Sequence, residues 1–430
     1  MRIVAEILIV LGGYVWAFST PDPLGWLVAL AVAFCPLQIG LIVYYYNGLF
    51  VSDFFLLGAL FLFLASSRER LRWSPRGLGI PFVLFLAWLL ISSLVAQYPS
   101  SRSVALSEWT RFLRGYLMFV VVFSASLQPA RFRRILWALV AGVFWEGFVA
   151  FLQWRRGYAG LAFLGEQRIA WRATGLFAHP TMFGEYVAML APLTVRLLVT
   201  HPFRPPWKRG LFTAGFLIVL GGLLGSYARA GWLGTGMGVV VAFGLPLLKM
   251  RAKLIARYKG PLIVLVLIGA LGIVRYAPVL QKQFTDPARK RSANVRKPLS
   301  WVAMEMSKDR ALFGVGLGNY RNNSWRYVPK VYPRAEAIGF DSWDELMQVV
   351  HNSYLLLSSE GGAFALLCFV LMILWLLRDA FLLGWRATGL IQNIGLGALG
   401  GLFAFSVVMF ASPNMYQEPF LMCFWALAGL

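Results

Sequence analysis

Residues 351–377 read HNSYLLLSSEGGAFALLCFVLMILWLL: a short polar motif runs directly into an apolar segment long enough to cross a membrane. Residues 291–350, upstream, are polar and mixed in charge, and an apolar run at 260–276 precedes them. The pattern predicts a long loop outside one membrane face, held between two spans. Because long loops of this kind usually carry function, we expect the functional site in or near this loop.

The whole chain has the composition of a polytopic membrane protein. Of its 430 residues, 59% are hydrophobic and only 13% are charged. Apolar runs of about 18 to 25 residues recur along it, which is typical of membrane helices and not of the alternating strands, about ten residues long, of outer-membrane barrels. We therefore expect an all-α bundle in lipid.

The apolar runs predict about twelve transmembrane helices, preceded by one extra N-terminal segment. They lie near residues 3–18, 24–43, 50–66, 80–97, 109–126, 135–154, 180–199, 210–226, 230–248, 260–276, 353–377, 390–411 and 419–430. The first run, 3–18, is the extra segment, which is either a further span or interfacial.

Positive charge predicts the orientation of these spans. Lys and Arg crowd alternate connections, which places those connections in the cytoplasm and the long loop on the outer side. The chain is then divided into residues 1–276 with spans and short loops, a large helical loop at 277–352 that carries site residues, and residues 353–430 with the C-terminal spans.

The chain is strongly basic, with 40 Lys and Arg against 18 Asp and Glu and a formal net charge of +22. Part of this excess follows from the bias of cytoplasmic loops. For the rest, membrane lipids or a lipid phosphate are better partners than nucleic acid, because no basic soluble domain studded with aromatic residues is present. The outer loops contain no Asp-x-Asp pattern and the histidines are scattered, so we expect no metal. No other cofactor is expected either.

His351 is the strongest candidate for catalysis. Ser342 and Glu345 form a capping-box pattern that opens a short helix just before it, so the imidazole is expected at the membrane rim on an ordered support. It is either a general base or an interfacial histidine that only hydrogen-bonds a backbone carbonyl. A helix turns about 100° per residue, so we expect His351 to share a face of the following helix with Tyr354 and Ser358, while Glu360 points to the opposite side. Glu360 is therefore expected to pair with an arginine or to cap another segment.

Arginines are candidate cations for an anionic substrate. Arg229 lies in a turn so short that its guanidinium must sit at the membrane boundary, where an arginine is costly unless paired. It either snorkels to lipid headgroups or binds an anionic substrate group. Arg296 lies in the long loop, and Arg172 is a plausible third cation. Pro180 fits the first turn of the next helix, with either His179 or Thr181 near its cap.

The long loop also contains two predictable local structures. The helix after Arg296 has an apolar stripe, expected to rest on the membrane surface, formed by Leu299, Val302, Ala303 and Met306. The glycines at 314, 316 and 318 then form either a phosphate cradle or, as we prefer, a tight bend. The strand, the following helix and the lysine of a P-loop are all missing here.

Two carboxyl groups, those of Glu146 and Glu185, fall within predicted spans. An isolated carboxyl at this depth is costly to ionise. We therefore expect each to pair with an arginine of the bundle, such as Arg196 or Arg114.

Four motifs, in this order, resemble the O-antigen ligase and O-antigen polymerase superfamily. They are Arg-Ala-Thr-Gly-Leu-Phe-Ala-His-Pro at 172–180, the Ala-Arg-Ala-Gly turn around Arg229, the Arg296 segment leading to Phe-Gly-Val-Gly-Leu-Gly-Asn-Tyr at 313–320, and His-Asn-Ser-Tyr-Leu-Leu-Leu-Ser-Ser-Glu-Gly-Gly at 351–362. The resemblance covers roughly residues 24–430. The twelve spans of the family, with a large periplasmic loop after the ninth, fit if the run at 24–43 is counted first. Within the superfamily the chain is most like an O-antigen ligase.

The resemblance implies an inverting, metal-independent glycosyl transfer at the periplasmic face of the cell inner membrane. The implied donor is an undecaprenyl-diphosphate-linked glycan, and the implied acceptor is a sugar hydroxyl of lipid A-core. His351 would take the acceptor proton, while Arg229 and Arg296 hold the leaving diphosphate. Three further residues are expected to support the site or to contact substrate: Arg172, Tyr320 and Glu360.

Three other functions remain open at this point. An O-antigen or exopolysaccharide polymerase and a protein O-oligosaccharyltransferase use the same donor, although the excess of basic residues in the long loop slightly favours an acceptor with phosphates. A transporter or flippase of lipid-linked glycan would use the same arginines only to bind. That function needs polar residues at mid-membrane depth along a pathway, and the sequence contains few.

Overall fold

The computed structural model of the chain describes residues 2–37, 40–44, 47–73, 79–96, 99–156, 172–249, 281, 294–340 and 342–430. Helices make up most of these residues, as the predicted all-α class requires. The predicted span at 260–276 and residues 282–293 of the long loop lie outside them.

The helices follow most of the apolar runs. The N-terminal half contains α1 (Arg2–Phe18), α2 (Pro23–Ala33), β1 (Gly40–Tyr44), β2 (Asn47–Phe50), α3 (Val51–Ala65), α4 (Gly79–Leu94), α5 (Pro99–Ser126), α6 (Pro129–Arg156), α7 (Pro180–Thr200) and α8 (Trp207–Ser226). The C-terminal half contains α9 (Arg229–Lys249), α13 (Arg296–Asp309), α14 (Tyr320–Ser324), α15 (Val328–Glu336), α16 (Trp343–Leu346), α17 (Ser353–Arg386), α18 (Gly389–Val408), the short 3₁₀ turns η2 (Met409–Ala411) and η3 (Asn414–Tyr416), and α19 (Glu418–Gly429). The described part of the long loop is thus helical, as predicted.

The predicted span at 24–43 is wrong. α2 ends at Ala33, and the last residues of the run belong to β1, which pairs with β2 in a hairpin. Pro36 has no N–H to donate and disfavours a helical conformation in the residue before it, so the helix does not continue. Beyond it the β-prone residues pair in antiparallel register, with Tyr44 opposite Asn47.

Five helices in the described part are long and apolar enough to cross a membrane: α6, α7, α8, α17, and α18 with η2. α1 to α4 and α19 are apolar but shorter. At about 1.5 Å per residue, a 16-residue helix such as α4 covers roughly 24 Å of a hydrocarbon core about 30 Å thick. The chain is a multi-pass membrane protein, and the count of about twelve spans stays a prediction.

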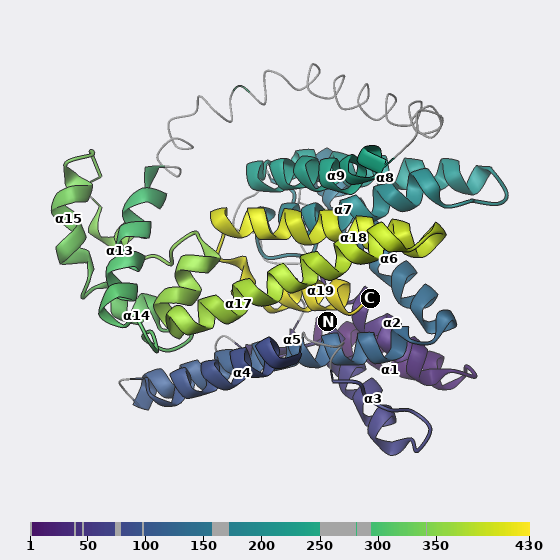
Figure 1. Cartoon of the computed structure of the whole chain (residues 1–430), viewed down its shortest axis with the longest axis horizontal. Coiled ribbons are helices and arrows are strands. Elements are labelled where there is room, and N and C mark those ends of the chain that lie inside the picture. Colours follow the sequence, from purple (N-terminus) through teal and green to yellow (C-terminus); the bar gives the residue numbers. More distant parts are fainter. Residues whose placement is uncertain are drawn as a thin grey trace.

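The centre of the bundle is formed by α17 and α18, which lie side by side (Figure 1). α18 also packs on α7 and α9, and α17 packs on α4. Gly238 of α9 and Gly400 of α18 allow the close contact between these two helices, because a Cβ on either residue would collide with the backbone carbonyl of the other. Small residues of this kind let membrane helices approach closely.

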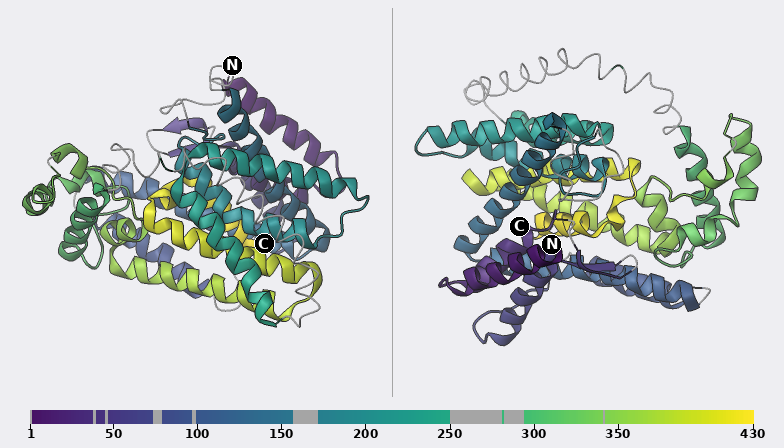
Figure 2. Two further views of the ribbon diagram at one scale, coloured as in Figure 1. Left: turned by 90° about the horizontal axis from the view of Figure 1, so that it is seen from above. Right: turned by 180° about the vertical axis from the view of Figure 1, so that it is seen from behind.

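The helical part of the long loop gathers at one end of the bundle, beside the start of α17 (Figures 1 and 2). The predicted apolar stripe of α13 is present, but its expected place on the membrane surface is wrong. Its four residues are fully buried, because α13 packs on α17, α15 and α16. The sequence pattern of an apolar helical stripe is the same whether the stripe faces lipid or protein.

α17 contains a break at Gly362, where the backbone adopts φ 83° and ψ 173°. Almost only glycine adopts this conformation. The chain at 311–316 crosses the break, and the N–H of Ala363 donates to the carbonyl of Ala311 at 2.8 Å. The indole of Trp88, on α4, donates to the carbonyl of Gly361 at 3.1 Å. The break in α17 is therefore a crossing point between the loop and the bundle.

Gly362→Ala should be among the most destabilising single methyl additions in the chain. A Cβ at this position would collide with the carbonyl of Leu312 and would also strain the backbone. We expect a loss of about 3 kcal/mol or more in the free energy of unfolding. Gly389→Ala is the matched control, because Gly389 also has a positive φ of 65° but has open space around it. Denaturant unfolding in detergent measures both, and equal losses would show that the crossing is not sterically constrained.

Candidate active site

His351 lies just outside α17 and not within it. The helix begins at Ser353, and Asn352 is its N-cap, with φ −156° and ψ 111°. The Asn352 side-chain oxygen accepts hydrogen bonds from the N–H groups of Tyr354 and Leu355, each at 3.0 Å. The expectation that His351 shares a face of this helix is therefore wrong. Its half-buried imidazole is positioned by the cap and by the preceding α16, whose N-cap is Ser342, as predicted.

Two of the candidate cations lie within electrostatic range of each other, and one of them, Arg296, lies within range of this imidazole. Arg229 is the first residue of α9 and Arg296 is the first residue of α13, and both are half-buried. Burial, followed by the nearby Arg229 guanidinium, lowers the pKa of Arg296, whereas the Glu185 carboxyl of α7 raises it. The three groups therefore lie within electrostatic range of one another. Three segments, which together span more than a hundred residues of the chain, bring two cations and one buried carboxyl into the same region.

The imidazoles of His351 and His179 belong to the same cluster. Burial, followed by the charge of Arg296, lowers the pKa of His351. Desolvation by surrounding atoms, then Arg172, then His351, lowers the pKa of His179 to about 4, although part of its surface is exposed. As predicted, His179 is the N-cap of α7, where its Nδ1 accepts a hydrogen bond from the N–H of Thr181 at 3.2 Å. Both rings are expected to be neutral at pH 7.

Arg172 holds the turn that presents Arg229. Its side chain is buried, at 8% exposure, and its Nε donates to the carbonyl of Ser226 at 2.8 Å. A terminal nitrogen donates to the carbonyl of Tyr227 at 3.2 Å. Carbonyls at the end of a helix have no partner within the helix, and here the guanidinium supplies one. Tyr227 itself adopts a left-handed conformation, with φ 51°, which reverses the chain into α9.

The segment after Arg172 is fixed by two side chains of α6. The Gln153 oxygen accepts from the N–H groups of Thr174 and Gly175, both at 2.9 Å. The Glu146 carboxyl accepts from the N–H of Leu176 at 2.8 Å. The prediction that Glu146 pairs with an arginine is therefore wrong, since its carboxyl accepts a hydrogen bond from a backbone amide instead.

The two arginines proposed as partners for buried carboxyls have other contacts. Arg114 forms an ion pair with Asp53 of α3, at 2.9 Å. Arg196 hydrogen-bonds the side chain of Asn393 and lies over the ring of Phe243. Both arginines brace the bundle away from the histidine cluster.

Glu360 caps another segment, which is one of the two predicted alternatives; the other was a pair with an arginine. Its carboxyl oxygens accept hydrogen bonds from the N–H of Gly318 at 2.9 Å and from the N–H of Tyr320 at 2.8 Å. Tyr320 is buried, with 1% of its surface exposed, and its hydroxyl donates to the carbonyl of Leu299 at 3.3 Å. Leu299 lies one turn after Arg296 in α13. Glu360 and Tyr320 therefore connect α17 to the helix that carries Arg296.

The glycine turn is a tight bend, as preferred, and the phosphate-cradle alternative is wrong. Its N–H groups are already used: Val315 donates to the carbonyl of Ser359 at 3.0 Å, and Gly316 to the carbonyl of Glu360 at 2.9 Å. The turn has positive φ values of 66°, 92° and 68° at its three glycines, 314, 316 and 318. Because α17 is broken nearby, its free carbonyls accept from this turn in place of the missing helical bonds.

The fold and the cluster define a multi-pass membrane protein with a cationic, histidine-containing site at one end of its helices. Residues 214–370 match the family model described as O-Antigen ligase. This match supports the O-antigen ligase superfamily, as the motifs predicted, and with it a membrane enzyme of the O-antigen ligase or polymerase type. The match begins within α8 and ends within α17. It contains five of the six candidate residues, and the sixth, Arg172, precedes it. No curated protein matches the chain.

Sequence reasoning missed three contributors to the cluster. His179 was interpreted only as a cap, and Glu185 only as a buried carboxyl, yet both lie within electrostatic range of the candidate residues. Gln153 was not considered at all. Asn352 could have been found, since an asparagine directly before an apolar helical run is a typical N-cap signal.

Removal of the Glu360 carboxyl should loosen the loop from the bundle. Glu360→Ala leaves two buried N–H groups without an acceptor, at a cost of about 1–3 kcal/mol each, and Glu360→Gln should cost less because its oxygen still accepts one bond. Glu305→Ala is a control that removes only a surface pair with Lys308, which is worth less than about 1 kcal/mol. Unfolding in detergent ranks the three variants. If Glu360→Ala proves as mild as the control, then Glu360 does not hold the glycine turn.

Proposed function

We propose that the protein is an inner-membrane glycosyltransferase that moves O-antigen polysaccharide from undecaprenyl diphosphate to a sugar hydroxyl of lipid A-core. The observation that carries this proposal is that Arg296 lies within electrostatic range of both His351 and Arg229, although the three residues come from separate segments. The family match supports the class of enzyme. A neutral base beside fixed cations is what transfer from a diphosphate donor requires.

In this proposal His351 accepts the proton of the acceptor hydroxyl as its oxygen attacks the anomeric carbon. The bond from that carbon to the diphosphate breaks, and the undecaprenyl diphosphate leaves with the electron pair. Direct displacement inverts the anomeric carbon. Negative charge builds on the diphosphate in the transition state, where the guanidinium groups of Arg229 and Arg296 stabilise it. The charge is thus neutralised by arginine and not by a metal.

The same cations keep the base in its active form. A general base must be unprotonated, and burial together with Arg296 lowers the pKa of His351 below its ordinary value of about 6.5. His179 and, beyond it, Arg172 face the same imidazole. The base therefore stays neutral at pH 7 and somewhat below. The active site is expected to face the periplasm, where both lipid-linked substrates would meet.

His351→Ala should abolish transfer and leave donor binding intact. Loss of a general base costs about 10²–10⁴-fold in rate. A purified assay with undecaprenyl-diphosphate glycan and lipid A-core, in the presence of a chelator and with products resolved by size, measures the transfer. His201→Ala is the matched control, because His201 lies at the far end of α7.

The same assay separates the alternative functions. A ladder on lipid A-core that the variant loses supports a metal-free ligase. Growth of the donor glycan with bare lipid A-core would identify a polymerase instead. Unimpaired transfer by His351→Ala would remove the proposed base, and no product at all with wild-type protein would favour a transporter.

Arg296→Gln should weaken donor affinity and also move the pH profile. Loss of a charge-assisted contact to the diphosphate predicts a drop of about tenfold or more. Arg296 lowers the pKa of His351, so its removal should raise that pKa and shift the acidic limb of the rate profile to higher pH. Lys297→Gln is the control, because Lys297 is the exposed neighbour. Arg229→Ala should weaken donor affinity as well. Unchanged donor affinity in both arginine variants would contradict the diphosphate role.

A further inference from the structure

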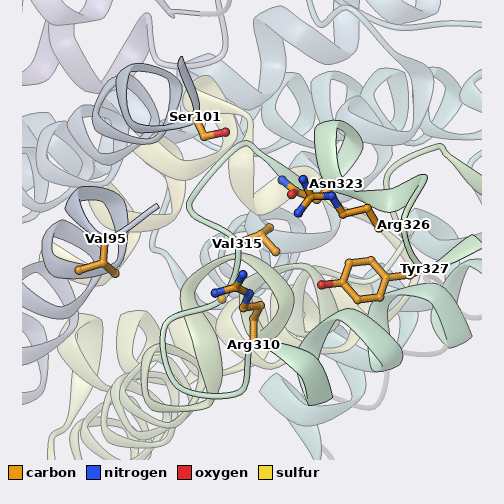
Figure 3. Close-up of a pocket in the computed structure, with 8 residues that line it drawn as sticks. Val95, Ser101, Arg310, Val315, Asn323, Arg326 and Tyr327 are labelled. Atoms are coloured by element: carbon orange, nitrogen blue, oxygen red, sulfur yellow. The ribbon is translucent and has the colours of Figure 1, made fainter. Parts of the chain in front are cut away.

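A narrow polar recess lies apart from the histidine cluster, between the start of α5 and the helical part of the long loop (Figure 3). The loop contributes the guanidinium groups of Arg310 and Arg326, and α5 contributes Ser101. Figure 3 shows the side chains of Arg310, Arg326 and Tyr327 directed toward the same space. Nearly all of the surface exposed within the recess is polar. It therefore offers two cations and several hydrogen-bonding groups in one small volume.

Tyr327 and Asp309 lie close to the two arginines of the recess. Both arginines lie within electrostatic range of the Tyr327 hydroxyl, which donates to the Asp309 carboxylate at 2.7 Å. Asp309 is also 3.9 Å from the Nε of Arg310. Desolvation and the bond to Asp309 raise the pKa of Tyr327 to about 12, so its hydroxyl stays neutral.

Ser101 adds a second, independent feature. The residue is 7% exposed and lies in the first turn of the 28-residue α5. Its backbone carbonyl accepts a hydrogen bond from the Asn319 side chain at 2.8 Å, which fixes its position against the loop. Among the residues that the structure describes, its hydroxyl makes no hydrogen bond. N–H groups in the first turn of a helix favour negative charge, so the α5 wall suits the same kind of ligand as the arginines.

We propose that this recess binds a phosphate group of the acceptor glycolipid, and that it holds the acceptor independently of the donor diphosphate. The inference rests on the proposed transfer to lipid A-core. Arginine pairs bind phosphate through several parallel hydrogen bonds, and the recess admits only a small polar group. The arginines of the donor site, Arg229 and Arg296, do not line it.

The position of the recess suits an acceptor that must reach His351. Val315 lines the recess and donates to the carbonyl of Ser359 on α17. Ser359 is six residues from the start of α17 at Ser353, which corresponds to about 9 Å along the helix. His351 precedes that start by two residues. A phosphorylated sugar bound in the recess would therefore extend its neighbouring sugars along α17 toward the base.

The test compares two forms of lipid A-core, phosphorylated and phosphatase-treated, for binding to purified protein in detergent. Wild-type protein should bind the phosphorylated form about tenfold more tightly or better. Arg310→Gln combined with Arg326→Gln should abolish this difference, and Ser101→Ala should reduce it without removing a charge. Arg321→Gln is the matched control, because Arg321 is an exposed arginine of α14 outside the recess. In the transfer assay, the double variant should raise the KM for the acceptor and leave the KM for the donor unchanged.

Several results would overturn the inference. Equal binding of the two forms by wild-type protein, or a preference that survives in both the double variant and Ser101→Ala, would do so. Nanodiscs with anionic or zwitterionic lipid test the other source of phosphate: if the double variant loses only binding to anionic lipid, then the recess holds a headgroup and not the acceptor. If wild-type protein binds phosphorylated lipid A-core through these arginines but transfers nothing to it, the recess stands and the proposed transfer fails.

Discussion

The arrangement of the site depends on the crossing of residues 311–320 over the break in α17. Gly362 opens the helix, and the carbonyls of Ser359 and Glu360 then accept hydrogen bonds from the crossing segment in place of helical ones. The Glu360 carboxyl secures the same segment through two further N–H groups. A broken helix at this depth is tolerated only where protein satisfies the freed backbone groups. The long loop is therefore joined to the bundle by backbone hydrogen bonds rather than only by side-chain contacts.

This junction helps to explain how Arg296 comes close to both His351 and Arg229. Tyr320 carries the constraint from Glu360 to α13, and α13 begins with Arg296. On the other side, Arg172 clamps the end of α8 and so fixes the turn that begins with Arg229. In each case a buried polar group meets a backbone group that would otherwise lack a partner, which is where hydrogen bonds matter most. The supporting residues thus act on the backbone that carries the cations.

The electrostatics of the cluster fit the chemistry that we propose. Cations near His351 disfavour its protonated form, and the same cations would stabilise a diphosphate as charge develops on it. Glu185 partly offsets them from within the bundle. A second set of cations, Arg310 and Arg326, lies at a distance along α17. Two separate groups of arginines suit a reaction in which both lipid-linked substrates carry phosphate.

The sequence by itself determined the membrane class, the helical loop, the family and the candidates His351, Arg229 and Arg296, because hydropathy, charge and short motifs are local properties. It also predicted that Glu360 either pairs with an arginine or caps another segment, since a buried carboxyl needs a partner. Only the tertiary structure decided which partner: a backbone turn for Glu360, a backbone amide for Glu146, and a protein core beneath α13. The sequence wrongly continued a helix through Pro36 and wrongly placed His351 within α17. These outcomes depend on contacts between segments far apart in the chain, which no local pattern encodes.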